Sequence, residues 1–122
     1  MNRDPNRMEL KRLRHLGLRA MKLAGRVKGL SWRARSVLTQ IGNYADSKGF
    51  AYPREGTLLE ATGLAESTVR RGLRELEELE IVSVVRDGWR GANSYQINIE
   101  RLEALPLLWG PAGPADVDEV DL

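Results

Sequence analysis

The spacing of hydrophobic residues changes from that of a helix to that of a strand near residue 80, and this change restricts the fold more than any other feature. Between residues 66 and 79, apolar side chains recur every three or four positions, which predicts an amphipathic helix. Residues 81–85 and 94–99 favour the two strands of a hairpin, and in the second strand apolar and polar residues alternate. A helix that leads directly into a hairpin predicts an α+β fold, here one that is mainly α. The helical stripe consists of Val69, Leu73, Leu76 and Leu79.

Two more core helices are predicted upstream of this pair of elements. Ser31 stands where an N-cap belongs, before a helix that is expected to end near Lys48 and Gly49. Pro53 is suited to the first turn of a second, shorter helix. That helix is expected to stop at Gly63, which can adopt a left-handed conformation.

Charge is distributed in blocks along the chain. Residues 1–30 contain nine Lys or Arg and two acidic residues, whereas residues 106–122 contain four acidic residues and no basic one. The basic block coincides with an amphipathic helix predicted over about residues 8–27, which Gly17 and Gly25 weaken. Such an asymmetry is typical of chains that meet a polyanion with one end.

The chain of 122 residues has the length of one compact domain with additional terminal segments. We expect a basic N-terminal amphipathic helix or arm over 1–29 and a folded domain over 30–105. An acidic C-terminal tail that contains Pro and Gly, over 106–122, is expected to be mobile.

Several functional classes are disfavoured by composition. The chain has no Cys, and it has no apolar run of the roughly 20 residues that span a bilayer, so a cytoplasmic location is expected. The single histidine, His15, lies among basic residues without a nearby group of carboxylates. No nucleotide-binding motif is present. We therefore predict a protein that is not an enzyme, with no metal and no cofactor.

The predicted order of elements is helix, short strand, helix, tight turn, helix and hairpin, and local sequence adds to it. The residues concerned are 53–76 and, in the hairpin, Gly88, Gly91, Asn93 and Tyr95. They resemble the winged helix-turn-helix family, which includes DNA-binding regulators of bacteria, phages and plasmids and the DNA-binding domains of replication proteins. The resemblance covers roughly residues 30–100. It implies a three-helix core with a β-hairpin wing, to which this chain adds the N-terminal basic helix.

Two positions depart from the pattern of that family. Ala65 stands where Ser or Thr usually caps the recognition helix, and alanine is a poor N-cap. Glu80 stands where a glycine usually ends that helix. We therefore expect either a strained exit into the wing or a helix that ends one residue away from the usual place.

Helical geometry indicates which side chains would meet DNA. A helix that buries Val69, Leu73 and Leu76 turns its opposite face toward a major groove, where arginine reads guanine. A wing over 86–91 would hold the flanking backbone. The predicted DNA-binding residues are Ser67, Thr68, Arg70, Arg71 and Arg74 in the helix 66–79, Arg86, Trp89 and Arg90 in the wing, and Arg33 and Arg35 after Ser31.

A simpler interpretation of these charges is also open. Glu66 and Arg70, like Arg71 and Glu75, are spaced to form ordinary surface ion pairs on one helix. However, Arg70 and Arg74 are like charges four residues apart, which favours a polyanion over them. Exposed arginines would favour DNA, and arginines held by glutamates would favour a protein partner.

The leading hypothesis is a sequence-specific double-stranded DNA-binding protein, a transcriptional regulator that acts as a homodimer. The dimer surface would come from the N-terminal helix, from the helix after Ser31, or from the leucines between 102 and 108. One alternative is a replication, partition or excision protein of a plasmid or phage. Another is a winged-helix module that binds a protein partner through the N-terminal helix or the acidic tail. No membrane partner is expected.

Overall fold

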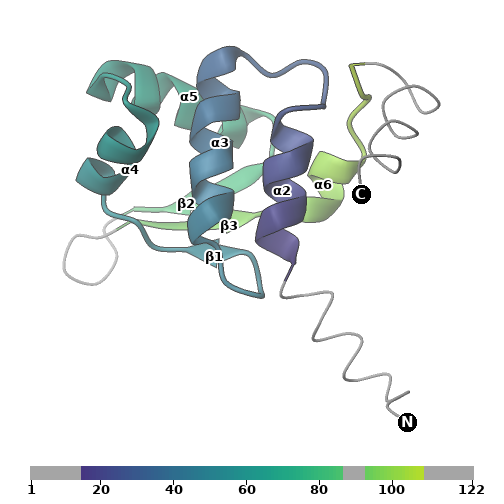
Figure 1. Ribbon diagram of the computed structural model, residues 1–122, viewed down its shortest axis with the longest axis horizontal. Coiled ribbons are helices and arrows are strands. Elements are labelled where there is room, and N and C mark those ends of the chain that lie inside the picture. Colours follow the sequence, from purple (N-terminus) through teal and green to yellow (C-terminus); the bar gives the residue numbers. More distant parts are fainter. Residues whose placement is uncertain (1–14, 87–92, 109–122) are drawn as a thin grey trace, which may run out of the picture.

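The computed structural model describes residues 15–86 and 93–108. Within them it has a mainly helical α+β fold with a small antiparallel sheet, so the predicted fold class is confirmed (Figure 1). The elements are α2 (Leu16–Ala24), α3 (Trp32–Tyr44), β1 (Phe50–Ala51), α4 (Glu55–Thr62), α5 (Glu66–Glu78), β2 (Val82–Val85), β3 (Ser94–Ile97) and α6 (Ile99–Glu103). None of these helices has the length and hydrophobicity of a transmembrane segment.

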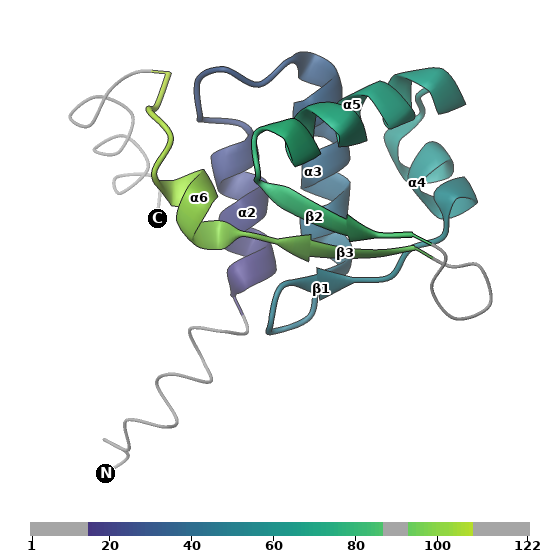
Figure 2. The same cartoon turned by 180° about the vertical axis from the view of Figure 1, so that it is seen from behind.

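The three strands form one sheet in the order β1-β3-β2, and both pairs are antiparallel. In the hairpin, Val82 lies opposite Ile97 and Val85 opposite Ser94, while Phe50 of β1 pairs with Gln96 on the other side of β3. Figures 1 and 2 show α2 and α3 side by side over one face of the sheet, and α5 along the β2 edge.

One hydrophobic core joins all the helices to the sheet. The predicted stripe of α5 points into it, with Val69, Leu73 and Leu76 buried and Leu79 partly buried. The largest fully buried side chains of this core are Tyr95, Leu38, Ile41, Leu58, Leu76, Ile81 and Leu102. Helix α2 contributes Ala20 and Ala24 to the same core, so this part of the expected arm packs on the domain. The domain boundaries themselves stay a prediction, and residues 1–14 lie outside the described residues.

A glycine contact explains how closely α2 approaches α3. A Cβ atom at Gly42 would lie 2.9 Å from the carbonyl oxygen of Gly17, and one at Gly17 would collide with the carbonyl oxygen of Gly42. Gly17, which weakens α2 as an isolated helix, is therefore required by the packing. Gly25 lies outside α2 as its C-cap, so the helix ends three residues before the predicted Val27.

The ends of the core helices agree only in part with the sequence. Ser31 is the N-cap of α3, and its Oγ accepts a hydrogen bond from the backbone N–H of Ala34 at 3.2 Å. The predicted end near Gly49 is wrong, because α3 ends at Tyr44 and Gly49 lies in the turn before β1 with φ +86°. Helix α4 begins two residues after Pro53, later than predicted, and ends at Thr62, with the left-handed Gly63 as its C-cap, as predicted.

The C-terminal part also differs from the expectation. Strand β3 ends at Ile97, and Ile99, predicted as part of the strand, begins α6 because the side chain of Asn98 caps that helix. Residues 106–108, predicted as the start of the mobile tail, run antiparallel to residues 26–28, with an isolated bridge between Val27 and Leu107. The rest of the predicted tail lies outside the described residues.

Candidate nucleic-acid interface

Helix α5 has a buried face and an opposite face of exposed polar side chains. It packs closely on α3, where a Cβ atom at Gly72 would lie 2.9 Å from the carbonyl oxygen of Arg33. On the outer face Ser67, Arg71 and Arg74 are exposed, and Thr68 is half-buried at its side. Among residues 15–86 and 93–108, Arg71 and Arg74 form no hydrogen bond or ion pair. Their guanidinium groups are therefore not neutralised by any described carboxylate.

Arg70 is also exposed, but two carboxylates hold it. Its Nη2 atom lies 2.6 Å from Oε1 of Glu66 and its Nε atom 3.2 Å from Oε1 of Glu55 at the start of α4. The side chain of Arg70 is 61% exposed, so each pair is worth about 0.2–1 kcal/mol. Glu66 is the partner that the helical spacing predicts, whereas Glu55 meets Arg70 only because α4 packs beside α5.

Arg86 follows β2 and is held in the same way. Its two terminal nitrogens donate to Oε1 and Oε2 of Glu77 at 3.0 and 2.7 Å, a bidentate geometry. The hydrogen bonds that Arg86 donates to Glu77 raise the pKa of Arg86 above its ordinary value, against the opposing effect of burial. Arg86 is therefore a permanent cation that is fixed beside α5.

Arg70, Arg74 and Arg86 meet at a hollow of about 360 Å³ between α5 and the hairpin. The amide of Asn93 donates to the hydroxyl of Tyr95 in its wall at 3.5 Å. Its lining residues are Glu55, Arg70, Leu73, Arg74, Arg86, Asn93 and Tyr95. The guanidinium groups of Arg70 and Arg86 are paired with glutamates there, whereas that of Arg74 has no described partner and can meet a phosphate group.

The other flank of α5 contacts the start of α3. Ser31 donates its backbone N–H to Oε2 of Glu75 at 2.7 Å and its hydroxyl to Oε1 at 2.6 Å. The ion pair between Arg71 and Glu75 that the spacing allows is not formed. The Glu75 carboxylate instead accepts both hydrogen bonds from Ser31, the N-cap of α3. Arg33 stacks on the exposed ring of Trp32, 5.5 Å from its centroid.

The predicted contact arginines of α5, together with Arg86, thus fall into two groups. Arg71 and Arg74 are exposed and unpaired within the described chain, whereas Arg70 and Arg86 are exposed and paired with glutamates. Arg35 lies apart from both groups, since it donates to the carbonyl oxygen of Ala24 at 2.9 Å and so ties α2 to α3. Trp89 and Arg90 lie outside the described residues.

Sequence reasoning missed the residues that surround these arginines. Glu77 is nine residues from its partner Arg86, and Glu55 is fifteen residues from Arg70, so no helical spacing connects them. Asn93 and Tyr95 were noted only as part of the hairpin, not as the wall of a hollow. No metal-binding group of His, Asp and Glu is found within the part of the chain that the structure describes.

Comparison with known proteins identifies this part of the chain. Residues 28–82 match the model of a protein family described as a helix-turn-helix domain. The match includes α3, α4 and α5 and ends at the first residue of β2. No curated protein and no solved structure gives a significant match. The predicted helix-turn-helix domain is therefore confirmed, and DNA is the partner that such a domain implies.

Proposed function

We propose that the helix-turn-helix domain within residues 28–82 binds double-stranded DNA sequence-specifically and that the protein regulates transcription. In this proposal α5 enters a major groove and reads a half-site. The wing, which begins at Arg86, contacts the flanking backbone. One domain of this size makes few base contacts, so we propose that two copies bind together on two half-sites.

The observation that carries this proposal is the pair of free arginines on the outer face of α5. Arg71 and Arg74 are one turn apart on the helix, exposed, and without a described partner. An unpaired guanidinium can donate two parallel hydrogen bonds to a guanine without first giving up a carboxylate. Ser67 lies on the same face and can donate to a base or a phosphate.

Arg70 and Arg86 support a second, less specific kind of contact. Both line the hollow beside the hairpin. Both also form ion pairs of modest strength with glutamates, because the arginine side chains are exposed. A DNA phosphate can replace such a carboxylate at small cost, because one charge-assisted hydrogen bond is exchanged for another. These two residues would then add affinity and salt dependence without base recognition.

The test is selection from a pool of random duplex DNA, with affinity for the selected sequence then measured across a salt series. The full chain is compared with Arg71→Ala/Arg74→Ala and with Lys28→Ala/Lys48→Ala, which removes two exposed positive charges outside α4, α5 and the sheet. We expect the arginine variant to lose the enriched motif and about 2 kcal/mol or more of specific binding. The lysine variant should keep the motif.

Two results would contradict the proposal. If the arginine variant selects the same motif as the unchanged chain, α5 does not read the bases. If neither the unchanged chain nor the arginine variant enriches any sequence, sequence-specific DNA recognition is excluded under these conditions. Repeated, regularly spaced sites in the selected DNA would favour a replication or partition role over gene regulation.

A protein-binding module is the second candidate, and the glutamates favour it. Glu55, Glu66 and Glu77 neutralise Arg70 and Arg86, so part of the predicted DNA face is a mixed-charge surface. Such a surface suits a protein partner with a complementary pattern of charges. This candidate predicts that the full chain binds duplex DNA without sequence preference and loses that binding at about 0.3 M salt.

A further inference from the structure

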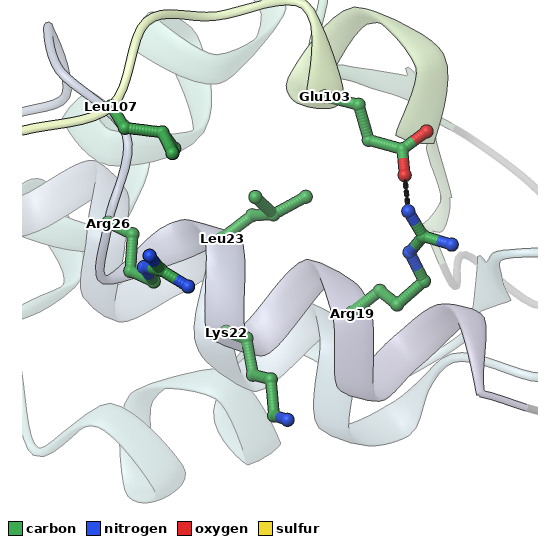
Figure 3. Close-up of a pocket in the computed structure, with 6 residues that line it drawn as sticks. All are labelled: Arg19, Lys22, Leu23, Arg26, Glu103 and Leu107. Carbon is green, nitrogen blue, oxygen red and sulfur yellow. Dashed lines mark hydrogen bonds and ion pairs between the residues drawn. The ribbon is translucent and has the colours of Figure 1, made fainter. Parts of the chain in front are cut away.

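A second hollow, of about 350 Å³, lies on the opposite side of the domain, between α2 and the chain that follows α6. Figure 3 shows side chains of α2 and of Arg26, which follows it, on one side and Glu103 and Leu107 on the other. Its lining residues are Arg19, Lys22, Leu23, Arg26, Glu103 and Leu107. Neither the helix-turn-helix domain nor the proposed DNA contacts account for it.

The charge of this hollow is positive. Arg19 and Lys22 are its exposed cations, and the one carboxylate of its lining, that of Glu103, forms an ion pair with Arg19. The Arg19 side chain is still 51% exposed, and Lys22 points outward from α2 (Figure 3). Leu23 and Leu107 add an apolar part to the lining. An anionic segment with a few apolar side chains would fit both properties.

The backbone brings the C-terminal part of the chain to this hollow. Lys28 donates its backbone N–H to the carbonyl oxygen of Pro106, and Leu108 donates to that of Arg26, both at 2.7 Å. These bonds flank the bridge between Val27 and Leu107. Leu107 itself lines the hollow. The described chain therefore ends at the rim of the hollow, at Leu108.

The segment that follows has the complementary composition. Residues 109–122 contain four acidic residues, no basic residue, and Val117 and Val120 between the acids. The first acid, Asp116, is eight residues beyond Leu108 and can therefore reach about 26 Å, well beyond the hollow. A connection of this length keeps the acids at an effective concentration of about a millimolar or more beside Arg19 and Lys22.

We infer that the acidic segment 109–122 binds this basic hollow of its own chain. Its carboxylates pair with Lys22 and with the exposed side of Arg19, while a valine packs on Leu23. This contact neutralises the basic face of α2 and keeps it from attracting DNA phosphates nonspecifically.

Zero-length cross-linking of the full chain with a carbodiimide tests this inference, since it joins an ammonium group only to a carboxylate in contact with it. We expect mass spectrometry of the monomer to show Lys22 linked to the acidic segment, in about tenfold excess over Lys48 at low salt. The exposed Lys48 precedes β1 and serves as the matched control. About 0.5 M salt should suppress the product, because it screens exposed charges.

A second, non-covalent measurement uses a full chain with Asp116→Asn, Asp118→Asn, Glu119→Gln and Asp121→Asn. We expect NMR shifts of the amides and guanidinium groups of residues 19–26, with the amides of α4 unchanged. A segment linked to Lys11, or to Lys22 of a second chain, would overturn the inference, as would unchanged spectra of residues 19–26. No DNA is present in either measurement, so a negative result leaves the proposed function untouched.

Discussion

Replacing Glu80 by glycine should stabilise this domain, because Glu80 ends α5 in a left-handed conformation. Its φ is 62°, and no other non-glycine residue of the described segments has a positive φ. The N–H of Ile81 donates to the carbonyl oxygen of Leu76 at 2.9 Å, and that of Glu80 to Glu77 at 3.0 Å. This pattern is a Schellman motif, in which the residue at position 80 must be left-handed whatever its side chain.

The magnitude follows from two opposing contributions. A left-handed conformation costs a residue with a Cβ atom about 1–2 kcal/mol. Glycine avoids that cost but loses more backbone entropy on folding, by about 0.5–1 kcal/mol. The net gain expected for Glu80→Gly is therefore about 0.5–1 kcal/mol. In a domain of this size, it corresponds to an increase in Tm of about 2–8 °C.

Thermal unfolding followed by circular dichroism measures this gain, with two control variants. Glu80→Gln removes only the negative charge near the C-terminus of α5, which interacts unfavourably with the helix dipole. Glu80→Ala also removes the exposed side chain but keeps the Cβ atom. The free energy of unfolding of Glu80→Gly should therefore exceed that of Glu80→Ala by about 0.5–1 kcal/mol. A Tm for Glu80→Gly equal to or below that of Glu80→Ala would refute the conformational argument.

Two further predictions concern packing and DNA affinity. Gly42→Ala should lower the free energy of unfolding by about 1–2 kcal/mol in urea, because its Cβ atom would lie 2.9 Å from the carbonyl oxygen of Gly17. Gly56→Ala in α4, where a Cβ atom meets nothing within 4 Å, should not be destabilising. Glu77→Gln should tighten binding to the selected DNA about two- to fivefold in fluorescence anisotropy, because it releases Arg86 from a pair worth about 1 kcal/mol or less. Unchanged or weaker binding would show that Arg86 does not approach the DNA.

Much of the fold could be predicted because its signals are local. The stripe of α5, the cap at Ser31 and the left-handed Gly63 each depend on a few neighbouring residues, and each is confirmed. The strained exit expected at Glu80 is found for the same reason. Such features follow from backbone sterics and hydrogen bonding within one or two turns.

The errors arise where a distant contact decides the conformation. Gly17 looked like a weakness in a helix, yet it is required because α3 crosses there. Ile99 continues the alternation of β3, but Asn98 caps a new helix whose Leu102 is buried in the core. Residues 106–108 resemble the start of a loop, but their backbone groups bond to residues 26–28. No pattern within a single segment contains this information.

The candidate interface shows the same division between local and tertiary information. The exposed arginines follow from the helical period, whereas only tertiary packing determines which of them meet glutamates. This distinction bears on function, since Arg71 and Arg74 have no described partner to give up, whereas Arg86 must exchange Glu77 for a phosphate. Base recognition should therefore depend on Arg71 and Arg74, whereas carboxylates should compete with DNA at Arg86, as at Arg70. Substitution of Arg71 should accordingly change which sequence is bound, whereas Arg86→Ala should weaken binding to all sequences alike.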